Sequence, residues 1–200
     1  VIDGEIAYMG GFNVGDEYVG LHRKFGYWRD THLRIEGPAL YSIQTRFILD
    51  WNQASEEHKI AYDPDLFPPF EPKGDIGIQI VTSGLVSRYE HIKYGFLKMI
   101  ASARKTIYIQ TPYFIPDASL LDALRIALLS KVQVNMMIPD RSDHPFIRWA
   151  SLSYIGELLK AGAHVYMYHK GFIHAKSIVI DDMIASVGTA NMDVVRGSTD

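Results

Sequence analysis

The stretch from residue 173 to residue 191 constrains the fold of this chain more than any other. Residues 173–180 alternate regularly, which predicts a β-strand that places His174 and Lys176 on one face. Asp181-Asp182 is a plausible turn, after which residues 184–187 can return as an antiparallel strand. We therefore expect a hairpin that carries an imidazole and an ammonium group side by side at one end.

The pairing register of this hairpin predicts which other side chains join them. If Ile180 pairs with Met183, Thr189 lies opposite His174, and Asn191 lies two residues further along the same strand. Imidazole, ammonium, hydroxyl and amide groups would then meet at one end of the hairpin. Such a set can hold and attack a phosphate group without a metal.

The same pattern occurs near the start of the chain. Residues 3–13 align with residues 181–191 at a constant offset, 181 − 3 = 178, with Asp, Ile, Ala, Gly and Asn matching in place. Asp3-Gly4 is also a strong hairpin turn signal. The partner strand and the matching His and Lys would precede Val1. We therefore expect the chain to be a piece of a longer protein that has two similar sites.

These motifs resemble those of a known family. The HKD motif of the phospholipase D superfamily is similar to the pattern His174-x-Lys176-x4-Asp181-x6-Gly188-Thr189-x-Asn191. Four segments resemble bacterial cardiolipin synthases: Gly-Phe-Asn-Val-Gly-Asp-Glu-Tyr (11–18), Trp-Arg-Asp-Thr-His (28–32), Gln-Thr-Pro-Tyr-Phe-Ile-Pro-Asp (110–117) and Gly-Thr-Ala-Asn-Met-Asp (188–193). The resemblance extends over nearly the whole chain, up to about Asp193.

The resemblance implies a two-step transfer at a phosphodiester. Two phosphatidylglycerol molecules would give cardiolipin and glycerol at the bacterial cytoplasmic membrane, through a phosphohistidine intermediate. The His of one motif would attack phosphorus, and the His of the other would protonate the leaving alcohol. Lys176, Thr189 and Asn191, with Asn13 of the first copy, would bind the phosphate oxygens. No cofactor is implied.

The expected catalytic set is His174, Lys176, Asp181 and Asp3, but the aspartates need a separate explanation. Asp181 follows His174 by seven residues, which corresponds to roughly 20 Å along an extended strand. It therefore cannot contact this His through a straight strand. We expect Asp181 and Asp3 to act structurally, at their turns.

The sequence departs from the family pattern at both ends. The first His and Lys are missing before Val1, and residues 191–198 drift from the expected pattern and contain an additional residue. One motif alone supplies no second histidine. We therefore expect the isolated chain to be nearly inactive, unless a homodimer brings two copies of His174 together as in single-motif relatives.

Composition narrows the possible partners. Lys and Arg number 20 against 23 Asp and Glu, for a net charge of −3, so we expect no nucleic-acid binding. This balance does not exclude phosphatidylglycerol or another anionic lipid, because a local site can be positive. The chain has no cysteine, and no pair of histidines combines zinc-ligand spacing with a third ligand, so we expect no metal. No apolar run is long enough to span a membrane, so we expect a soluble fragment whose parent is attached to the membrane through other segments.

Element patterns predict an α/β fold with a phospholipase D-like mixed sheet flanked by helices. We expect residues 1–54 to be the remainder of a first lobe, 55–74 a proline-rich linker, and 75–200 a second lobe with the complete motif. Strand and helix alternate in the second lobe, and the strands are expected at 75–82, 106–110, 132–138 and 163–168. A helix is expected in the first lobe at 38–52.

Two other interpretations remain open. One is a different reaction of the same superfamily, such as phosphatidylserine synthesis, lipid hydrolysis or nucleic-acid cleavage. The other is a non-catalytic remnant that binds a membrane or a partner protein. Absence of cardiolipin and glycerol after incubation of the full-length protein with phosphatidylglycerol would favour the first of these. A covalent phosphate trapped on histidine would argue against the second.

Overall fold

We describe the chain from a computed structural model, which covers residues 1–23, 26–71, 74–83, 89–141 and 145–193. Its strands are β1 (Ile6–Gly10), β2 (Tyr27–Arg29), β3 (His32–Glu36), β4 (Thr106–Gln110), β5 (Phe114–Ile115), β6 (Gln133–Pro139), β7 (His164–Tyr168), β8 (Gly171–Ile173), β9 (Ser177–Ile180), β10 (Ile184–Val187) and β11 (Met192–Asp193). Its helices are α1 (Leu40–Ala54), the short 3-10 helix η1 (Pro64–Leu66), α2 (His91–Ser102), α3 (Ala118–Leu129) and α4 (Pro145–Lys160).

The chain divides into two compact units. Unit 1 comprises residues 1–9 and 33–82, and unit 2 comprises residues 10–32 and 83–200. Residues 194–200 lie outside the described residues, and so does most of the expected departure from the family pattern after Asp193. The units differ from the predicted lobe boundaries because residues 10–32 join the later part of the chain, where β2 pairs in parallel with β8.

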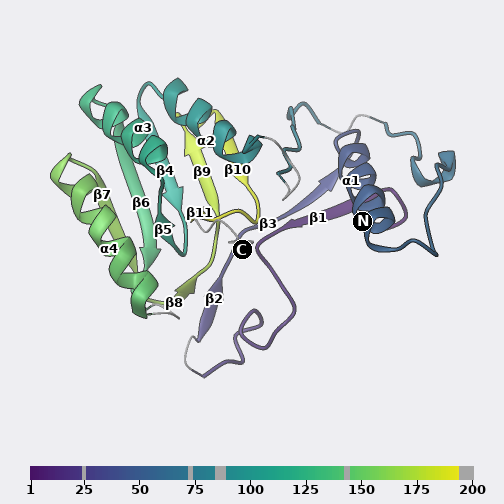
Figure 1. The fold of residues 1–200 in the computed structure, drawn as a ribbon, viewed down its shortest axis with the longest axis horizontal. Coiled ribbons are helices and arrows are strands. Elements are labelled where there is room, and N and C mark those ends of the chain that lie inside the picture. Colours follow the sequence, from purple (N-terminus) through teal and green to yellow (C-terminus); the bar gives the residue numbers. More distant parts are fainter. Residues whose placement is uncertain (24–25, 72–73, 84–88, 142–144, 194–200) are drawn as a thin grey trace. The chain divides into compact units, whose positions relative to one another are not determined.

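Unit 2 is built around a five-stranded mixed sheet in the order β10-β9-β4-β6-β7. β4, β6 and β7 run parallel, whereas β9 is antiparallel to both β4 and β10. The parallel strands are connected through α3 and α4, as the alternation of strand and helix predicts. Helices α2, α3 and α4 cover one face of the sheet (Figure 1). The predicted α/β class, with a mixed sheet and flanking helices, is confirmed.

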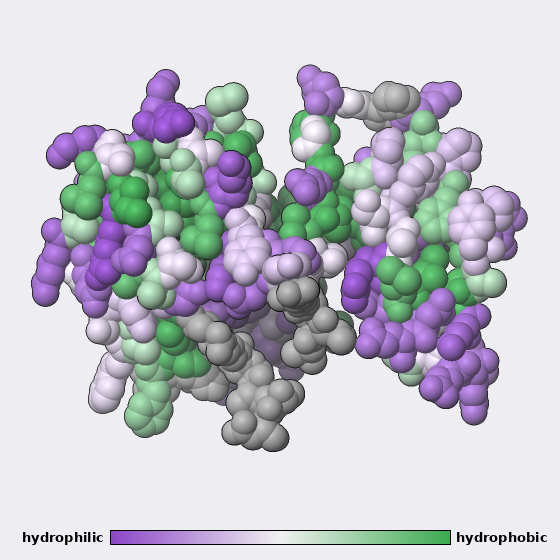
Figure 2. Space-filling model, turned by 45° about the horizontal axis from the view of Figure 1, so that its top comes forward, coloured by the Kyte–Doolittle hydropathy of each residue, from purple (hydrophilic) through white to green (hydrophobic). Residues whose placement is uncertain are grey.

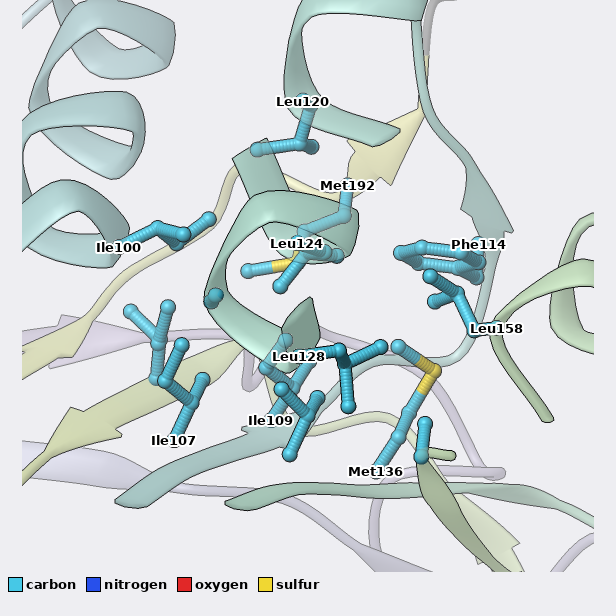
Figure 3. Packing of buried hydrophobic residues seen from close by; sticks show 14 of the residues in the cluster. Ile100, Ile107, Ile109, Phe114, Leu120, Leu124, Leu128, Met136, Leu158 and Met192 are labelled. Carbon is cyan, nitrogen blue, oxygen red and sulfur yellow. The ribbon is translucent and has the colours of Figure 1, made fainter. Parts of the chain in front are cut away.

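α3 forms much of the contact between the helical layer and the sheet. Leu120, Leu124 and Leu128 recur at intervals of four and therefore lie on one face of the helix. All three belong to one buried cluster with Ile107 and Ile109 of β4, and none of the five is more than 8% exposed. Figure 3 shows Leu128 beside Ile109. Burial of each such side chain stabilises the fold by roughly 1.5–3 kcal/mol.

Asp117 caps the start of α3. Its Oδ1 accepts a hydrogen bond from the Leu120 N–H at 2.9 Å, and its Oδ2 lies 2.8 Å from Lys93 Nζ. Partial burial by itself raises the pKa of Asp117. The hydrogen bonds from Lys93, the Leu120 N–H and the Ser119 hydroxyl together outweigh this effect and lower the pKa from 3.8 to about 2.

We expect Asp117 to make unit 2 sensitive to acid. Because its pKa is lower in the folded than in the unfolded state, its stabilisation is complete above about pH 4 and is lost as the pH falls towards 2. Asn also caps helices, so Asp117→Asn should remain folded and reduce this loss of unfolding free energy by about 1–2 kcal/mol. Denaturant unfolding at about pH 5 and pH 2 measures the difference. Asp122→Asn, on the same helix, should behave like the wild type, and an unchanged acid loss in Asp117→Asn would contradict the prediction.

Unit 1 is the smaller of the two units, and one of the elements predicted for its residues does not form. β1 pairs with β3, and Leu40 of α1 packs with Ala7 and Ile35 in its core. Part of the predicted linker packs back on α1, where the Tyr41 hydroxyl donates to the Pro68 carbonyl at 2.6 Å. The strand predicted at 75–82 does not form, and these residues are irregular. Their alternating pattern fits a strand, but it supplies no neighbouring strand to satisfy the backbone groups.

Hydrophobic and hydrophilic residues are interspersed over the face of each unit that Figure 2 displays. Within the described ranges, no helix combines the length and the apolar character needed to cross a membrane. The same ranges contain no cluster of three or more His, Cys, Asp or Glu side chains that could hold a metal ion.

Candidate active site

The β9–β10 hairpin forms, but its register differs from the predicted one. Ile180 pairs with Ile184 rather than with Met183, so the loop contains three residues instead of two. Asp181 and Asp182 both have left-handed backbones, with φ of 54° and 57°, and the Met183 N–H donates to the Ile180 carbonyl at 3.0 Å. The prediction was wrong by one residue because hydrophobic alternation does not reveal the length of a turn.

The N-terminal copy of this turn has the same geometry. Ile2 bridges to Ile6 as Ile180 pairs with Ile184. Asp3 and Gly4 also have left-handed backbones, with φ of 51° and 69°. The sequence repeat is therefore also a repeat of local structure.

The strand predicted over residues 173–180 is interrupted at the His and Lys of the motif. β8 pairs with β2, whereas β9 pairs with β4 and β10. Residues 174–176 connect β8 to β9, and the His174 N–H donates to the Arg29 carbonyl at 2.7 Å. The predicted cross-strand pairing of Thr189 with His174 is therefore wrong, since neither residue lies in a strand.

Asp30 holds the His174 imidazole, and the sequence analysis did not single it out. Its Oδ2 lies 2.7 Å from His174 Nδ1, and the two side chains are only 6% and 13% exposed. The Thr31 N–H donates to the other carboxylate oxygen, Oδ1, at 2.7 Å. A carboxylate on Nδ1 favours the tautomer in which Nε2 carries a lone pair, which is the form that can attack phosphorus or accept a proton. The signal that could have indicated Asp30 is its place within the family-like segment 28–32.

Three aromatic rings surround this imidazole. The ring centroids of Trp28, Tyr18 and Phe172 lie 5.1, 5.8 and 6.2 Å from that of His174. Trp28 also packs on Phe172 and on Tyr18, at 4.6 and 4.9 Å. This packing restricts rotation of the imidazole and lowers the access of water, which strengthens its interaction with Asp30.

Lys176 and Asn191 lie in the same region as Asp193. Lys176 is only 8% exposed, and its Nζ donates to the His174 carbonyl at 2.6 Å. Asn191 Nδ2 lies 3.4 Å from Asp193 Oδ2, and its buried Oδ1 has no hydrogen-bond partner among the residues that the structure describes. Burial raises the pKa of Asp193, against the lowering effects of Asn191 and Lys176.

The other predicted phosphate-binding residues have different positions. Asn13 Nδ2 donates to the Tyr18 hydroxyl at 3.1 Å, so Asn13 is linked to His174 through the Tyr18 ring. Thr189 is exposed in the turn after β10. The structure thus brings His174, Lys176 and Asn191 into one region of unit 2 and connects Asn13 to it.

Asp181 lies at the opposite end of β9 from His174. Its carboxylate accepts hydrogen bonds from the N–H groups of Arg104, Lys105 and Thr106, each at 2.8 Å. These bonds, with that from Thr106 the strongest, lower the pKa of Asp181. The carboxylate therefore fixes the hairpin to the start of β4. Asp3 occupies the equivalent turn in unit 1.

We expect Asp181→Asn to destabilise unit 2 without altering the chemical step. The amide keeps one acceptor oxygen but removes the charge that three backbone donors bind, whereas the left-handed backbone remains accessible to Asn. Thermal unfolding should show a lower midpoint, while kcat per folded molecule stays unchanged. The matched control is Asp182→Asn, in the same turn, which should leave the midpoint unchanged. A loss of kcat with an unchanged midpoint would indicate that Asp181 acts in catalysis instead.

Comparison with known proteins identifies the family. The family model described as "Cardiolipin synthase, PLD-like domain" matches residues 96–195, which is half of the chain. The major cardiolipin synthase ClsA of Bacillus subtilis is 67% identical over 194 residues, covering 97% of this chain and 40% of that protein. A cardiolipin synthase of Listeria welshimeri is 60% identical over 193 residues, covering 96% of this chain and 40% of that protein. The chain thus spans about 40% of the length of these curated relatives.

A solved structure supports the fold. The crystal structure of phosphatidylserine synthase from Haemophilus influenzae matches 91% of this chain and 50% of its own, with a TM-score of 0.58 and 16% sequence identity. At that identity the similarity extends to the fold alone. The family model and the sequence relatives confirm the resemblance predicted from the motifs. The chain belongs to the phospholipase D-like cardiolipin synthase family.

Proposed function

We propose that the protein containing this chain transfers a phosphatidyl group between two phosphatidylglycerol molecules and forms cardiolipin and glycerol. The observation that carries the proposal is the Asp30–His174 pair, with Nδ1 bound at 2.7 Å inside an aromatic enclosure. Family membership and the high identity to named cardiolipin synthases support the choice of substrate.

In the proposed first step, Nε2 of one catalytic histidine attacks the phosphorus of a phosphatidylglycerol. A bond forms between nitrogen and phosphorus, and the bond from phosphorus to the glycerol headgroup oxygen breaks. The second histidine protonates that oxygen as glycerol leaves. In the second step, this second histidine takes a proton from a hydroxyl of another phosphatidylglycerol. The oxygen of that hydroxyl attacks phosphorus, the bond from phosphorus to Nε2 of the first histidine breaks, and cardiolipin is released.

We assign to His174 one of these two histidine roles, for which its Nε2 is suited. Lys176 and Asn191 would bind the non-bridging oxygens and stabilise the negative charge of the transition state. The second histidine would come from the other copy of the motif, whose turn this chain carries at Asp3, or from a second copy of the chain. Binding of phospholipid at a bacterial membrane is part of the same proposal.

Incubation of the full-length protein with phosphatidylglycerol tests the proposal. Cardiolipin and glycerol should appear in equal amounts, and acid-labile phosphate should be trapped on histidine. Release of phosphatidic acid without cardiolipin would indicate a hydrolase instead. Transfer to serine in the presence of an activated phosphatidyl donor would indicate phosphatidylserine synthesis.

A further inference from the structure

Helix α4 exposes two large aromatic side chains. The helix buries Ser151, Ile155 and Leu158. On the opposite face, Phe146 and Trp149 are 83% and 70% exposed, and their rings pack edge to face at 6.3 Å. The outer face of a helix on a water-soluble protein is normally polar, so these aromatic residues require an explanation.

The aromatic end of α4 lies at the edge of the sheet that carries the candidate site. α4 follows the carboxyl end of β6, and His174 follows β7 and β8. The Asp140 N–H after β6 donates to the Tyr168 carbonyl at the end of β7, at 3.2 Å. Figure 1 shows the start of α4 and β8 at the same end of the sheet. Ligands of parallel α/β sheets bind at this edge.

Basic side chains accompany the aromatic ones. Arg148 lines a shallow, largely apolar crevice together with Tyr113 and Met167. Arg141 and Lys170 are exposed in the segments that follow β6 and β7. The carboxylate of Asp140 pairs with His169 at 3.1 Å. Three cations, Arg141, Arg148 and Lys170, therefore occur in α4 and in the segments that follow β6 and β7, with Asp140 beside them, whereas Asp143 lies outside the described residues.

We propose that Phe146 and Trp149, with Leu152 of the same helix, which is 37% exposed, form a docking face for a phospholipid bilayer with anionic headgroups. Trp and Phe rings partition into the boundary between headgroups and acyl chains, and the neighbouring Arg and Lys side chains complement the headgroup charge. Docking through this face brings the edge with His174 towards the lipid phosphodiesters. The inference rests on the proposed function for the lipid nature of the substrate, and it adds which surface meets the membrane.

Single cysteines can test this docking face, because the chain itself contains none. In the full-length protein, with any cysteines outside this chain replaced, Phe146→Cys carries a fluorophore in nanodiscs made of equal parts phosphatidylglycerol and phosphatidylcholine. The matched control is Ile126→Cys, 63% exposed in the last turn of α3 near the amino end of β6. The label at 146 should be quenched by lipids with a shallow spin label and protected from iodide. The label at 126 should be quenched by iodide and should not be quenched by the spin-labelled lipids.

Two outcomes would overturn the docking face. Quenching of the label at 146 by iodide would mean that this surface faces water. Protection from both quenchers would mean that another part of the protein, or a second copy, covers it. The measurement needs no turnover and can be repeated in His174→Ala. Cardiolipin formation without lipid quenching at 146 refutes only the docking face, whereas lipid quenching without cardiolipin formation refutes only the proposed function.

Kinetics provide a second readout. The double variant Phe146→Ser, Trp149→Ser should raise the apparent KM for phosphatidylglycerol in vesicles by about tenfold, because the rings no longer contribute interfacial binding. Turnover of dispersed short-chain phosphatidylglycerol should be unchanged. Equal losses with both substrates would overturn the inference, and an unchanged thermal midpoint confirms that the variant is folded.

Discussion

Replacement of His174 by alanine is expected to reduce cardiolipin formation by the full-length protein about ten-thousandfold or more. The variant lacks the ring nitrogen that forms a bond to phosphorus or moves the proton of the alcohol, and no neighbouring described side chain supplies an equivalent group at the same position. The aromatic rings around the imidazole should preserve the local fold. Rates of cardiolipin and glycerol formation measure the loss, and thermal unfolding reports on the fold.

A matched histidine variant makes this experiment specific. His164 is exposed at the amino end of β7, at the opposite edge of the sheet, so His164→Ala should retain activity within about twofold. Retention of a tenth or more of wild-type activity by His174→Ala would contradict the assignment. Such a result would favour a non-catalytic role in binding a membrane or a partner protein.

The second largest effect is expected for Asp30→Asn, about a thousandfold loss of kcat with little change in KM. The Asn amide can donate a hydrogen bond to Nδ1, which favours the tautomer with the proton on Nε2. Nε2 then lacks the lone pair that both proposed steps require. Asp30 contacts the imidazole at 2.7 Å rather than the substrate, so it acts as a positioning residue.

The tautomer of His174 is the readout that separates this role from a structural one. Nitrogen NMR should show the proton on Nδ1 in the wild type and on Nε2 in Asp30→Asn, with similar thermal midpoints. The control is Asp16→Asn, which alters an exposed carboxylate within residues 10–32, the part of the chain that also contains Asp30. It should change neither the tautomer of His174 nor the thermal midpoint. A large loss of stability together with an unchanged tautomer would assign Asp30 to folding rather than to catalysis.

Local patterns predicted most of the elements in unit 2. The strand expected at 106–110 is β4, with the same bounds, and the strand expected at 163–168 is β7, from His164 to Tyr168. Both depend on neighbours along the chain, because alternation in a strand is a local pattern. Such neighbours are visible in the sequence itself.

Predictions that required a partner from elsewhere were less successful. The alternating residues 75–82 form no strand, and residues 173–180 divide between two sets of neighbouring strands. The register of the hairpin differs from the predicted one by one residue, because Ile180 pairs with Ile184 across a loop of three residues. In each case the sequence pattern does not specify the neighbouring segment with which the residues pair.

The sequence by itself determined the motif around His174, its repeat at an offset of 178 residues, and with them the family and the expected chemistry. Only the tertiary structure placed Asp30, 144 residues away, on the imidazole, and Asp181 on the backbone of Arg104 to Thr106. The reason is physical. The period of a sequence records which face of an element is buried, whereas the partner on that face depends on the pairing of strands such as β2 and β8, which no local period encodes.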